Sequence, residues 1–213
     1  MKIGILGSGV VAQTLAEGLA RHGYEVMVGT REPEKLKEWG EGKAGVSLGS
    51  GSEAAGFGEV VVLAVKGSAA AAALRLATAG VLRGKVVIDA TNPIADEPPE
   101  QGVLKFFTTY DSSLMEKLQG EFPEVRFVKA FNSVGAHNFI DPKFGGTRPT
   151  MFICGEDEAA KKTVERLMDE VGWESADMGG AIAARAIEPL CMLWCIPGFL
   201  KNEWTHAFKL LRQ

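Results

Sequence analysis

The feature of this chain that most restricts its fold is a group of small residues directly after its first apolar run. Residues 7–12 read Gly-Ser-Gly-Val-Val-Ala and stand between an apolar run at 2–7 and a helical pattern at 10–23. In such a strand–turn–helix unit, the first glycine permits the tight turn, the second admits a pyrophosphate, and the small third residue lets helix and strand pack closely. The free N–H groups at the helix start can then bind phosphate. The pattern predicts a dinucleotide-binding unit.

The alternation of apolar strands and helices continues through the first half of the chain. Continuous apolar strands separated by helices are typical of a parallel sheet that is covered on both faces. We therefore predict an α/β fold with a Rossmann-type, doubly wound, mostly parallel sheet. Further strands are expected at 24–29, 59–66 and 85–93, and helical segments at 33–40, 52–58 (with Ser52 as its cap) and 68–82.

The second half of the chain has longer irregular segments. Residues 94–110 lack a clear period and are expected to form a long loop, which in a compact domain is often functional. From Ala181 the pattern becomes helical, with a break near Pro197-Gly198. We predict a dinucleotide-binding domain at 1–179 and a C-terminal helical cap at 180–213.

Between the loop and the cap, the pattern predicts helices at 111–122 and 157–172 (capped by Asp157) and strands at 125–132, 150–155 and 173–179.

Charge and composition argue against several classes of protein. The chain of 213 residues has 27 acidic residues against 23 Lys and Arg, a formal net charge of −4, so neither nucleic acid nor an anionic membrane is an expected partner. The longest apolar stretch, 186–200, is interrupted by Glu188 and two prolines. No secretory signal is recognisable at the start. The phosphate turn lacks the Lys of a nucleoside triphosphatase.

Cysteine usage indicates the compartment. The chain has three cysteines, a small and odd number that does not suit a disulfide framework, so a reducing, cytoplasmic location is expected. Cys191 and Cys195 could share one helical face, but further ligands at a suitable spacing are missing. We therefore expect no metal site.

The end of the second strand carries Thr30 and Arg31, where many dinucleotide-binding folds carry an acid. An acid there binds the ribose hydroxyls of NAD and would repel a 2′-phosphate. The planar guanidinium of Arg31, the hydroxyl of Thr30 and the charge of Lys35 suit such a phosphate. These residues predict NADP(H) as the cofactor. Glu32 and Glu34 weaken the local positive field, and an ordinary solvated run of mixed charge is the alternative interpretation.

These segments together resemble a known family. The chain is similar to the NADPH-dependent reductases of the deazaflavin coenzyme F420 and to their relatives of unassigned substrate. It is similar also to the cytosolic domain of the six-transmembrane metalloreductases. The resemblance extends nearly end to end. The residues that carry it are 4–35, 60–66, 86–93, 128–136, 151–162 and 184–194.

The resemblance implies a set of cofactor-binding positions. Family members often have a proline after the strand at 59–66, where this chain has Lys66-Gly67. The implied positions are Gly7, Ser8, Gly9, Val10 and Val11 at the phosphate turn, Thr30, Arg31 and Lys35 at the 2′-phosphate, Val65 and Lys66 at the end of that strand, Asn92 and Pro93 at the end of the next, and Ala136 at the nicotinamide end.

The acceptor is expected at the carboxyl ends of the strands. Its walls would be formed by Asn132, Ser133 and Val134, with Met192 and Trp194 closing the cleft. Family members that reduce F420 often have His where this chain has Asn132. Each position has an alternative: the asparagines can bind neighbouring backbone, and the Met–Leu–Trp run can be core or dimer contact. His137 lies close to the expected nicotinamide end, where a structural role is favoured.

Hydride passes directly between a nicotinamide and a conjugated ring, so we assign no catalytic residue. The expected function is an NADPH-dependent oxidoreductase that acts on a small-molecule redox acceptor, with F420 as the leading candidate. A flavin, quinone or ferric-chelate reductase and a non-catalytic NADPH-binding sensor are the alternatives. A hydroxy-acid or pyrroline-carboxylate dehydrogenase would need a longer C-terminal domain. Large apolar residues at Trp194, Ile196, Phe199 and Leu200 predict a homodimer.

Overall fold

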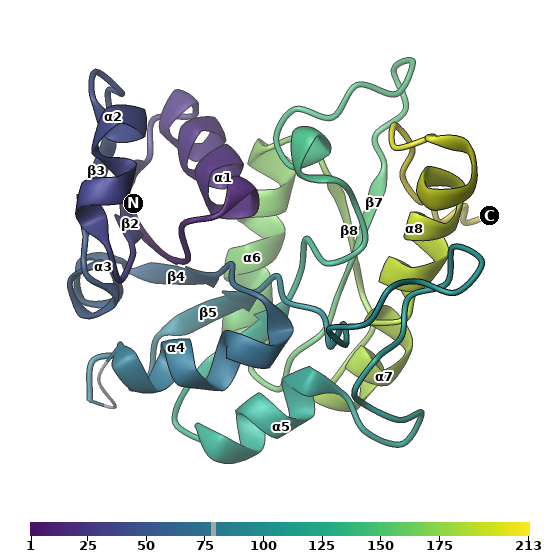
Figure 1. Cartoon of the computed structure of the whole chain (residues 1–213). Helices are drawn as coiled ribbons and strands as arrows, with labels where there is room; N and C mark the ends of the chain where they lie inside the picture. Colours follow the sequence, from purple (N-terminus) through teal and green to yellow (C-terminus); the bar gives the residue numbers. More distant parts are fainter. Residues whose placement is uncertain (78–79) are drawn as a thin grey trace.

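A six-stranded parallel sheet forms the centre of the computed structural model, which describes residues 1–77 and 80–213. Its strand order, β3-β2-β1-β4-β5-β6, runs outward in both directions from β1 and β4, as in the doubly wound topology that the sequence predicts (Figure 1). In this arrangement the carboxyl ends of all six strands lie along one edge of the sheet. The strands are β1 Lys2–Leu6, β2 Glu25–Gly29, β3 Val46–Gly49, β4 Val60–Leu63, β5 Val86–Asp89 and β6 Arg126–Lys129.

Two more strands extend the structure beyond β6. β7 (Thr150–Ile153) and β8 (Glu174–Asp177) pair in parallel with each other. An isolated antiparallel bridge between Lys129 and Cys154 connects β6 to this pair. The sheet is therefore mostly parallel.

Helices cover both faces of the sheet, and the strand residues alternate between the two cores. Val60 and Val62 of β4 belong to one buried cluster, whereas Val61 and Leu63 belong to the other. This alternation is why the buried strand reads as a continuous apolar run. The first cluster includes α1 (Val10–Arg21) and α6 (Glu158–Glu170), and the second includes α3 (Gly51–Phe57), α4 (Ala70–Leu76) and α5 (Leu114–Glu121).

Short elements complete the chain, and two of them differ from the sequence-based expectation. The strand β3 was not predicted, because it has only four residues with a single buried position. Helix α3 is capped by Ser50 rather than Ser52: the Ser50 hydroxyl accepts from the Glu53 N–H at 3.2 Å, and the Glu53 carboxylate accepts from the Ser50 N–H at 2.7 Å. The remaining elements are α2 Lys37–Gly40, α7 Ala184–Ile187, α8 Leu190–Lys201, η1 Pro33–Leu36, η2 Gly67–Ala69, η3 Ala136–Asn138 and η4 Ala181–Ala183.

Several predicted segments agree with the structure. The Asp157 carboxylate accepts from the Ala160 N–H at 2.7 Å and caps α6, and residues 94–110 form a loop with isolated bridges. The predicted helix at 68–82 is found as η2 and α4 but ends at Leu76; residues 77 and 80–82 are not helical, and residues 78 and 79 of that prediction lie outside the described residues.

The C-terminal segment departs most from the prediction. The helical break lies at Glu188-Pro189, and α8 continues through Pro197 to a left-handed residue, Asn202, at φ 56°. A proline inside a helix costs about 3 kcal/mol, but the buried side chains of Trp194 and Cys195 hold the preceding turn in place. Residues 202–213 are not helical. The left-handed Asn202 ends α8, and the following residues bond to the start of β7 through the Thr150 N–H and the Phe208 carbonyl.

The same C-terminal segment is strongly apolar. Ala181–Lys201, a stretch of 21 residues with an 18-residue window of mean hydropathy 1.3, is long and apolar enough to cross a membrane by length and composition, a test that core helices also pass. Here Glu188, in the middle of that stretch, is bonded inside the protein.

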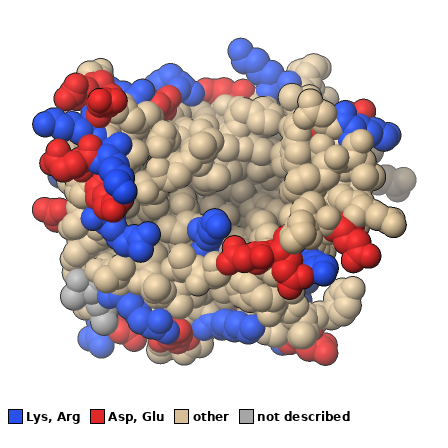
Figure 2. Space-filling model, viewed as in Figure 1, with Lys and Arg blue, Asp and Glu red and all other residues tan. Residues whose placement is uncertain are grey.

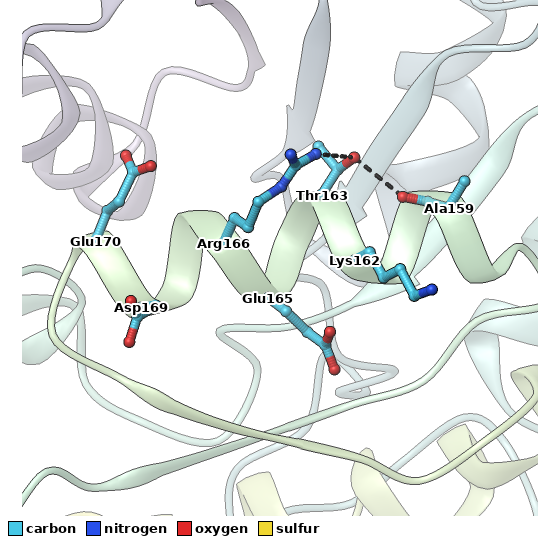
Figure 3. A pocket seen from close by; sticks show the side chains of 7 residues that line it. All are labelled: Ala159, Lys162, Thr163, Glu165, Arg166, Asp169 and Glu170. Carbon is cyan, nitrogen blue, oxygen red and sulfur yellow. Dashed lines mark hydrogen bonds between the residues drawn. The ribbon is translucent and has the colours of Figure 1, made fainter.

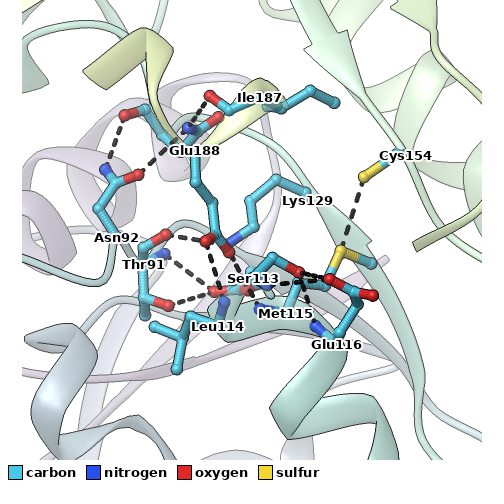
Figure 4. Close-up of polar contacts among 12 residues, drawn as sticks. Thr91, Asn92, Ser113, Leu114, Met115, Glu116, Lys129, Cys154, Ile187 and Glu188 are labelled. Carbon is cyan, nitrogen blue, oxygen red and sulfur yellow. Dashed lines mark hydrogen bonds and ion pairs between the residues drawn. The ribbon is translucent and has the colours of Figure 1, made fainter. Parts of the chain in front are cut away.

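The most buried polar contact in the fold is centred on the Lys129 ammonium group (Figure 4). Its Nζ lies 2.7 Å from Asp89 Oδ2 and 3.0 Å from Glu188 Oε1, and it donates to the Thr91 carbonyl at 2.9 Å. Burial alone would lower the pKa of Lys129, but the carboxylates of Asp89 and Glu188 reverse this effect, so that the pKa is raised and the amine stays charged. The cluster joins β5, β6 and the C-terminal cap.

Helix α5 completes the charge balance of this cluster. The Glu188 carboxylate accepts from the N–H groups of Leu114 at 2.9 Å and Met115 at 3.0 Å, which are the first residues of the helix. A second contact lies beside it, where the Arg185 guanidinium donates to the Glu116 carboxylate at 2.8–3.1 Å. This guanidinium lowers the pKa of Glu116 to about 2. The N-terminus of α5 is therefore held by two residues from the C-terminal cap.

We expect the variant Lys129→Met to lower the free energy of unfolding by about 3–5 kcal/mol, because it leaves two buried carboxylates without their cation. Urea unfolding followed by circular dichroism measures the change. The matched control is Lys105→Met, which removes an exposed pair with Glu97 at 2.9 Å and is expected to cost no more than about 1 kcal/mol. Equal stability of the two variants would contradict a structural role for the buried cluster.

Candidate functional site

The turn between β1 and α1 has two glycines with different physical roles. Gly7 has φ 139°, and a Cβ there would lie 2.1 Å from the Ala64 carbonyl oxygen, so neither the backbone nor the space admits a side chain. Gly9 has φ −79°, and a Cβ there meets no heavy atom of the described residues within 4 Å. Gly7 is therefore required by the fold, whereas Gly9 leaves open space above the helix.

The N-terminus of α1 faces that open space. Within the part of the chain that the structure describes, no side chain caps this 12-residue helix, and its first turn has no acidic residue. The first N–H groups of the helix and its dipole are thus free to act on an anion. Val10 at the first position is 72% exposed, so the helix start is accessible from solvent.

A cavity of about 590 Å³ lies over this helix start and along the carboxyl ends of β1, β2 and β4. Its size is in the range of pockets for small molecules and cofactors. It brings together nine of the predicted cofactor residues: Gly7, Ser8, Gly9, Val10, Val11, Thr30, Arg31, Val65 and Lys66. Four others, Lys35, Asn92, Pro93 and Ala136, are not among its lining residues.

Sequence reasoning missed the small residues on the far wall of the cavity. Ala69, Ala72 and Ala73 from η2 and α4 line it, together with Leu76 and Gly51. The run of alanines predicts a helix. The sequence signal for the cavity wall was that Ala69, Ala72 and Ala73, spaced as on one helix face, are all small. Small side chains there leave this part of the cavity open.

The rim of the cavity at the end of β2 carries Arg31, which is exposed. The Thr30 hydroxyl accepts from the Glu32 N–H at 3.2 Å. Lys35 forms an exposed ion pair with Glu32 at 2.5 Å, and this ammonium group, more than Arg31, lowers the pKa of the Glu32 carboxyl. Arg31 is therefore the cation of this run that reaches the cavity.

Lys66 lines the cavity at the end of β4, on the side away from Arg31. Its Nζ lies 3.5 Å from Asp96 Oδ1, and both side chains are largely exposed. Such a pair stabilises by no more than about 1 kcal/mol, so Lys66 can exchange partners readily. The next residue, Gly67, is needed because a Cβ there would lie 2.0 Å from the Asn92 carbonyl oxygen.

Asn92 and Asn132 form a reciprocal amide pair after β5 and β6. The Asn92 Nδ2 donates to the Asn132 carbonyl at 2.7 Å, and the Asn132 Nδ2 donates to Asn92 Oδ1 at 3.2 Å and to the Ile187 carbonyl at 2.9 Å. Asn132 is 3% exposed, and its Oδ1 has no hydrogen-bond partner among the described residues. The pair holds the two loops together and ties them to α7.

Phe131, the residue before Asn132, is under backbone strain. Phe131 has φ 61°, a conformation that is unfavourable for a bulky aromatic residue. Its ring is buried against Phe139 with centroids 5.2 Å apart. Packing therefore holds the chain in this conformation directly before residues 132–134. Strain of this kind is often found at binding sites.

The predicted residues Met192 and Trp194 lie on α8. Trp194 is 6% exposed, its Nε1 donates to the His206 carbonyl at 2.8 Å, and its ring lies against Gly135. Met192 is half-buried at the same cluster. Ser133 and Val134 are buried as well, and Ala136 begins η3.

The face that carries these loops is hollowed near its middle, and uncharged atoms form most of the hollow, with charged groups mainly at its rim (Figure 2). The carboxylate nearest to the strand ends, Asp89, is already bonded to Lys129 and Thr91. The site offers amides, backbone N–H groups and one ammonium group, an arrangement suited to binding and orientation rather than to proton transfer.

Another depression, of about 650 Å³, lies on the outer face of α6 (Figure 3). All of its lining residues come from this one helix, and most of them are charged. It is remote from the strand ends and is the solvated surface of an amphipathic helix.

Comparison with known proteins places these features in a family. Residues 2–93 match the family described as NADP oxidoreductase, coenzyme F420-dependent. A solved structure from Arthrobacter sp. FB24, provisionally described as an F420-dependent NADP-reductase, is 33% identical, with 100% of each chain covered and a TM-score of 0.92. An imine reductase from Myxococcus stipitatus in complex with NADP+ shares the fold at 13% identity and a TM-score of 0.69, over 95% of this chain and 63% of that chain.

Longer proteins are related as well. The metalloreductase STEAP3 of Rattus norvegicus is 33% identical over 203 residues, which cover 93% of this chain and 39% of the relative. The metalloreductase STEAP2 of Homo sapiens is 27% identical over 189 residues, 88% of this chain and 35% of the relative. The chain thus spans less than two fifths of the length of these curated relatives.

The two glycines of the turn give a matched pair of variants. We expect Gly7→Ala to lower the free energy of unfolding by about 3 kcal/mol or more, because of its φ and the contact with Ala64. Gly9→Ala should cost no more than about 1 kcal/mol, yet weaken NADPH binding about tenfold or more, since its methyl group occupies the phosphate position. Urea unfolding and fluorescence titration measure the two effects. Undiminished NADPH affinity in Gly9→Ala would mean that no pyrophosphate lies over α1.

Proposed function

This chain belongs to the family described as NADP oxidoreductase, coenzyme F420-dependent, and from that premise we propose that it binds NADP(H) in the cavity over α1 and exchanges hydride with a small-molecule redox acceptor. The observation that carries the proposal is the uncapped start of α1 below the open space at Gly9, with Arg31 at one end of the same cavity. A pyrophosphate at the first N–H groups leaves its adenosine half within reach of the Arg31 end.

The two ends of the cavity bind different parts of NADP(H). Thr30 and Arg31 bind the 2′-phosphate, while the wall of Ala69, Ala72 and Ala73 packs against the adenine ring. Lys35 does not line the cavity, but its positive charge favours a phosphate nearby. Its ion pair with Glu32 weakens this effect. At the other end, Val65, Lys66, Asn92 and Pro93 lie toward the nicotinamide, with Ala136 beyond them.

The chemistry needs little from the protein beyond position. A bound NADPH supplies a hydride, two electrons with one proton, to a conjugated acceptor. Asn132, Ser133 and Val134 fix the loop along which the acceptor lies, and the uncharged hollow suits its apolar ring. Any proton that the acceptor needs comes from solvent, because Asp89 is bonded to Lys129. We assign no catalytic acid or base.

Two kinds of acceptor have specific support. F420 is the leading candidate, because it is named in the family description and in that of the Arthrobacter protein. A flavin is the second candidate, since the rat metalloreductase is as similar in sequence as the Arthrobacter protein. A ferric chelate takes one electron per iron, so two of them would be reduced in turn by a flavin that has accepted the hydride. Asn132, in place of the histidine often found in F420-reducing members, favours this second candidate. A quinone reductase and a non-catalytic NADPH sensor are further alternatives.

A cytoplasmic homodimer is part of the proposal. Because Trp194 is buried, the apolar side chains available for a dimer contact are Leu193, Phe199 and Leu200 on α8, each 45–58% exposed. Side chains of this kind on one helix are typical of an interface between copies of a chain.

The 2′-phosphate assignment predicts a change in cofactor selectivity. Arg31→Ala should weaken NADPH binding by roughly 10- to 100-fold, as expected for the loss of hydrogen bonds to a charged group, and leave the weaker NADH binding unchanged. Lys35→Ala is the matched control, and its effect should be smaller because Lys35 is paired with Glu32. Calorimetric titration of both cofactors measures the ratio. Wild-type protein that binds NADH as tightly as NADPH would refute the assignment.

The acceptor is identified by anaerobic turnover with a panel of compounds. We expect NADPH oxidation with F420, followed by the absorbance of both compounds, and slower oxidation with FMN, a quinone or ferric citrate. Faster turnover with FMN or ferric citrate would favour the second candidate. Tight NADPH binding with no turnover of any acceptor would favour the sensor and refute the enzyme.

A further inference from the structure

Gly135 in the loop after β6 is a glycine that the backbone does not require. Its φ of −72° and ψ of 145° are accessible to any residue. A Cβ at this position would instead lie 2.8 Å from Trp194 Cη2, 3.0 Å from Trp194 Cζ2 and 2.8 Å from His137 Cε1. The loop therefore approaches the indole ring so closely that only a hydrogen atom fits between them.

Of the two side chains against Gly135, Trp194 is the one that cannot move away. His137 is a short flexible side chain on a partly exposed turn, where its Nε2 lies 3.0 Å from Asn138 Nδ2. The Trp194 ring is 6% exposed and contacts the rings of Trp204 and His206 at centroid distances of 5.6 Å and 5.0 Å. The indole is a fixed surface on which the loop rests.

The C-terminal segment, residues 202–213, holds this indole from behind. The Trp194 Nε1 donates to the His206 carbonyl at 2.8 Å, and His206 Nε2 bonds to the Trp194 carbonyl at 2.9 Å. This second bond requires the proton on Nε2, because a carbonyl only accepts. The segment is anchored in turn on β7, where the Thr150 N–H donates to the Phe208 carbonyl at 2.8 Å.

We propose that Trp194 is a positioning residue: the indole, held by the C-terminal segment, sets the position of loop 133–138 and through it the nicotinamide end of NADP(H). The inference rests on the proposed function, in which Ala136, next to Gly135, lies at that end. Trp194 itself touches neither cofactor nor acceptor. The adenosine end, at Thr30 and Arg31, belongs to another part of the sheet edge and does not depend on Trp194.

The inference makes Gly135 and Trp194 a coupled pair, which a double-mutant cycle can test. The variants are Gly135→Ala, Trp194→Phe and their combination, because the smaller ring of Phe withdraws the two atoms that the new methyl group would meet. The control is Gly120→Ala, at an exposed glycine of α5 where a Cβ meets no heavy atom of the described residues within 4 Å. Each variant is assayed for kcat with the best acceptor, for 2′,5′-ADP affinity and for the free energy of unfolding.

We expect Gly135→Ala to lower kcat about tenfold or more, since displaced reacting groups lose rate steeply, while 2′,5′-ADP binds within about twofold of wild type. In the Trp194→Phe background, Gly135→Ala should lower kcat no more than about twofold further. Gly120→Ala should keep the wild-type kcat. Additive losses in the cycle, or equal kcat in Gly135→Ala and Gly120→Ala, would overturn the inference. Absence of NADPH binding by wild-type protein would instead overturn the proposed function, and the unfolding cycle would still decide whether Trp194 positions Gly135.

Discussion

The buried ammonium group of Lys129 is the constraint on which the arrangement of this protein depends. One cation with two carboxylates leaves an excess negative charge in the interior, and the N–H groups at the start of α5 offset it. None of these partners is stable in place without the others. β5, β6, α5 and the C-terminal cap must therefore assemble together, and the loops that follow β5 and β6 inherit a fixed geometry. Asn92 follows Asp89 by three residues, and Asn132 follows Lys129 by three residues, so the amide pair comes directly after the buried cluster in both segments.

The candidate site has two halves that are built in different ways. The half over α1 comes mainly from two local segments: residues 6–31, with the turn, the helix start and the end of β2, and residues 64–76, from the end of β4 into α4. The half beyond β5 and β6 comes from contacts between distant segments, such as Asn132 with Ile187 and Gly135 with Trp194. A chain can therefore keep its dinucleotide half while the acceptor half changes. This separation is consistent with a family whose relatives include proteins described as F420-dependent reductases and as metalloreductases.

Local sequence patterns account for what could be predicted. The turn at Gly7–Gly9, the parallel sheet, the Asp157 cap and the cavity position of Arg31 each follow from neighbouring residues. The partners of Lys129 could not be predicted, because periodicity does not reveal which distant carboxylates meet a lysine; Glu188 inside an apolar run was the only signal. The helix through Pro197 was predicted wrongly for a related reason, since the packing that tolerates the proline comes from tertiary contacts.

No side chain of the described residues caps α1, and this has a consequence for the lifetime of the protein. A helix start without a side-chain acceptor leaves part of its hydrogen bonding to water or to a ligand. Any molecule that binds there in the folded state alone adds RT ln(1 + [L]/Kd) to the folding equilibrium. With the proposed cofactor as that molecule, the fraction of chains open to proteases falls as the cellular supply of reduced nicotinamide rises. Abundance of the protein would then follow the metabolic state of the cell without a separate regulator.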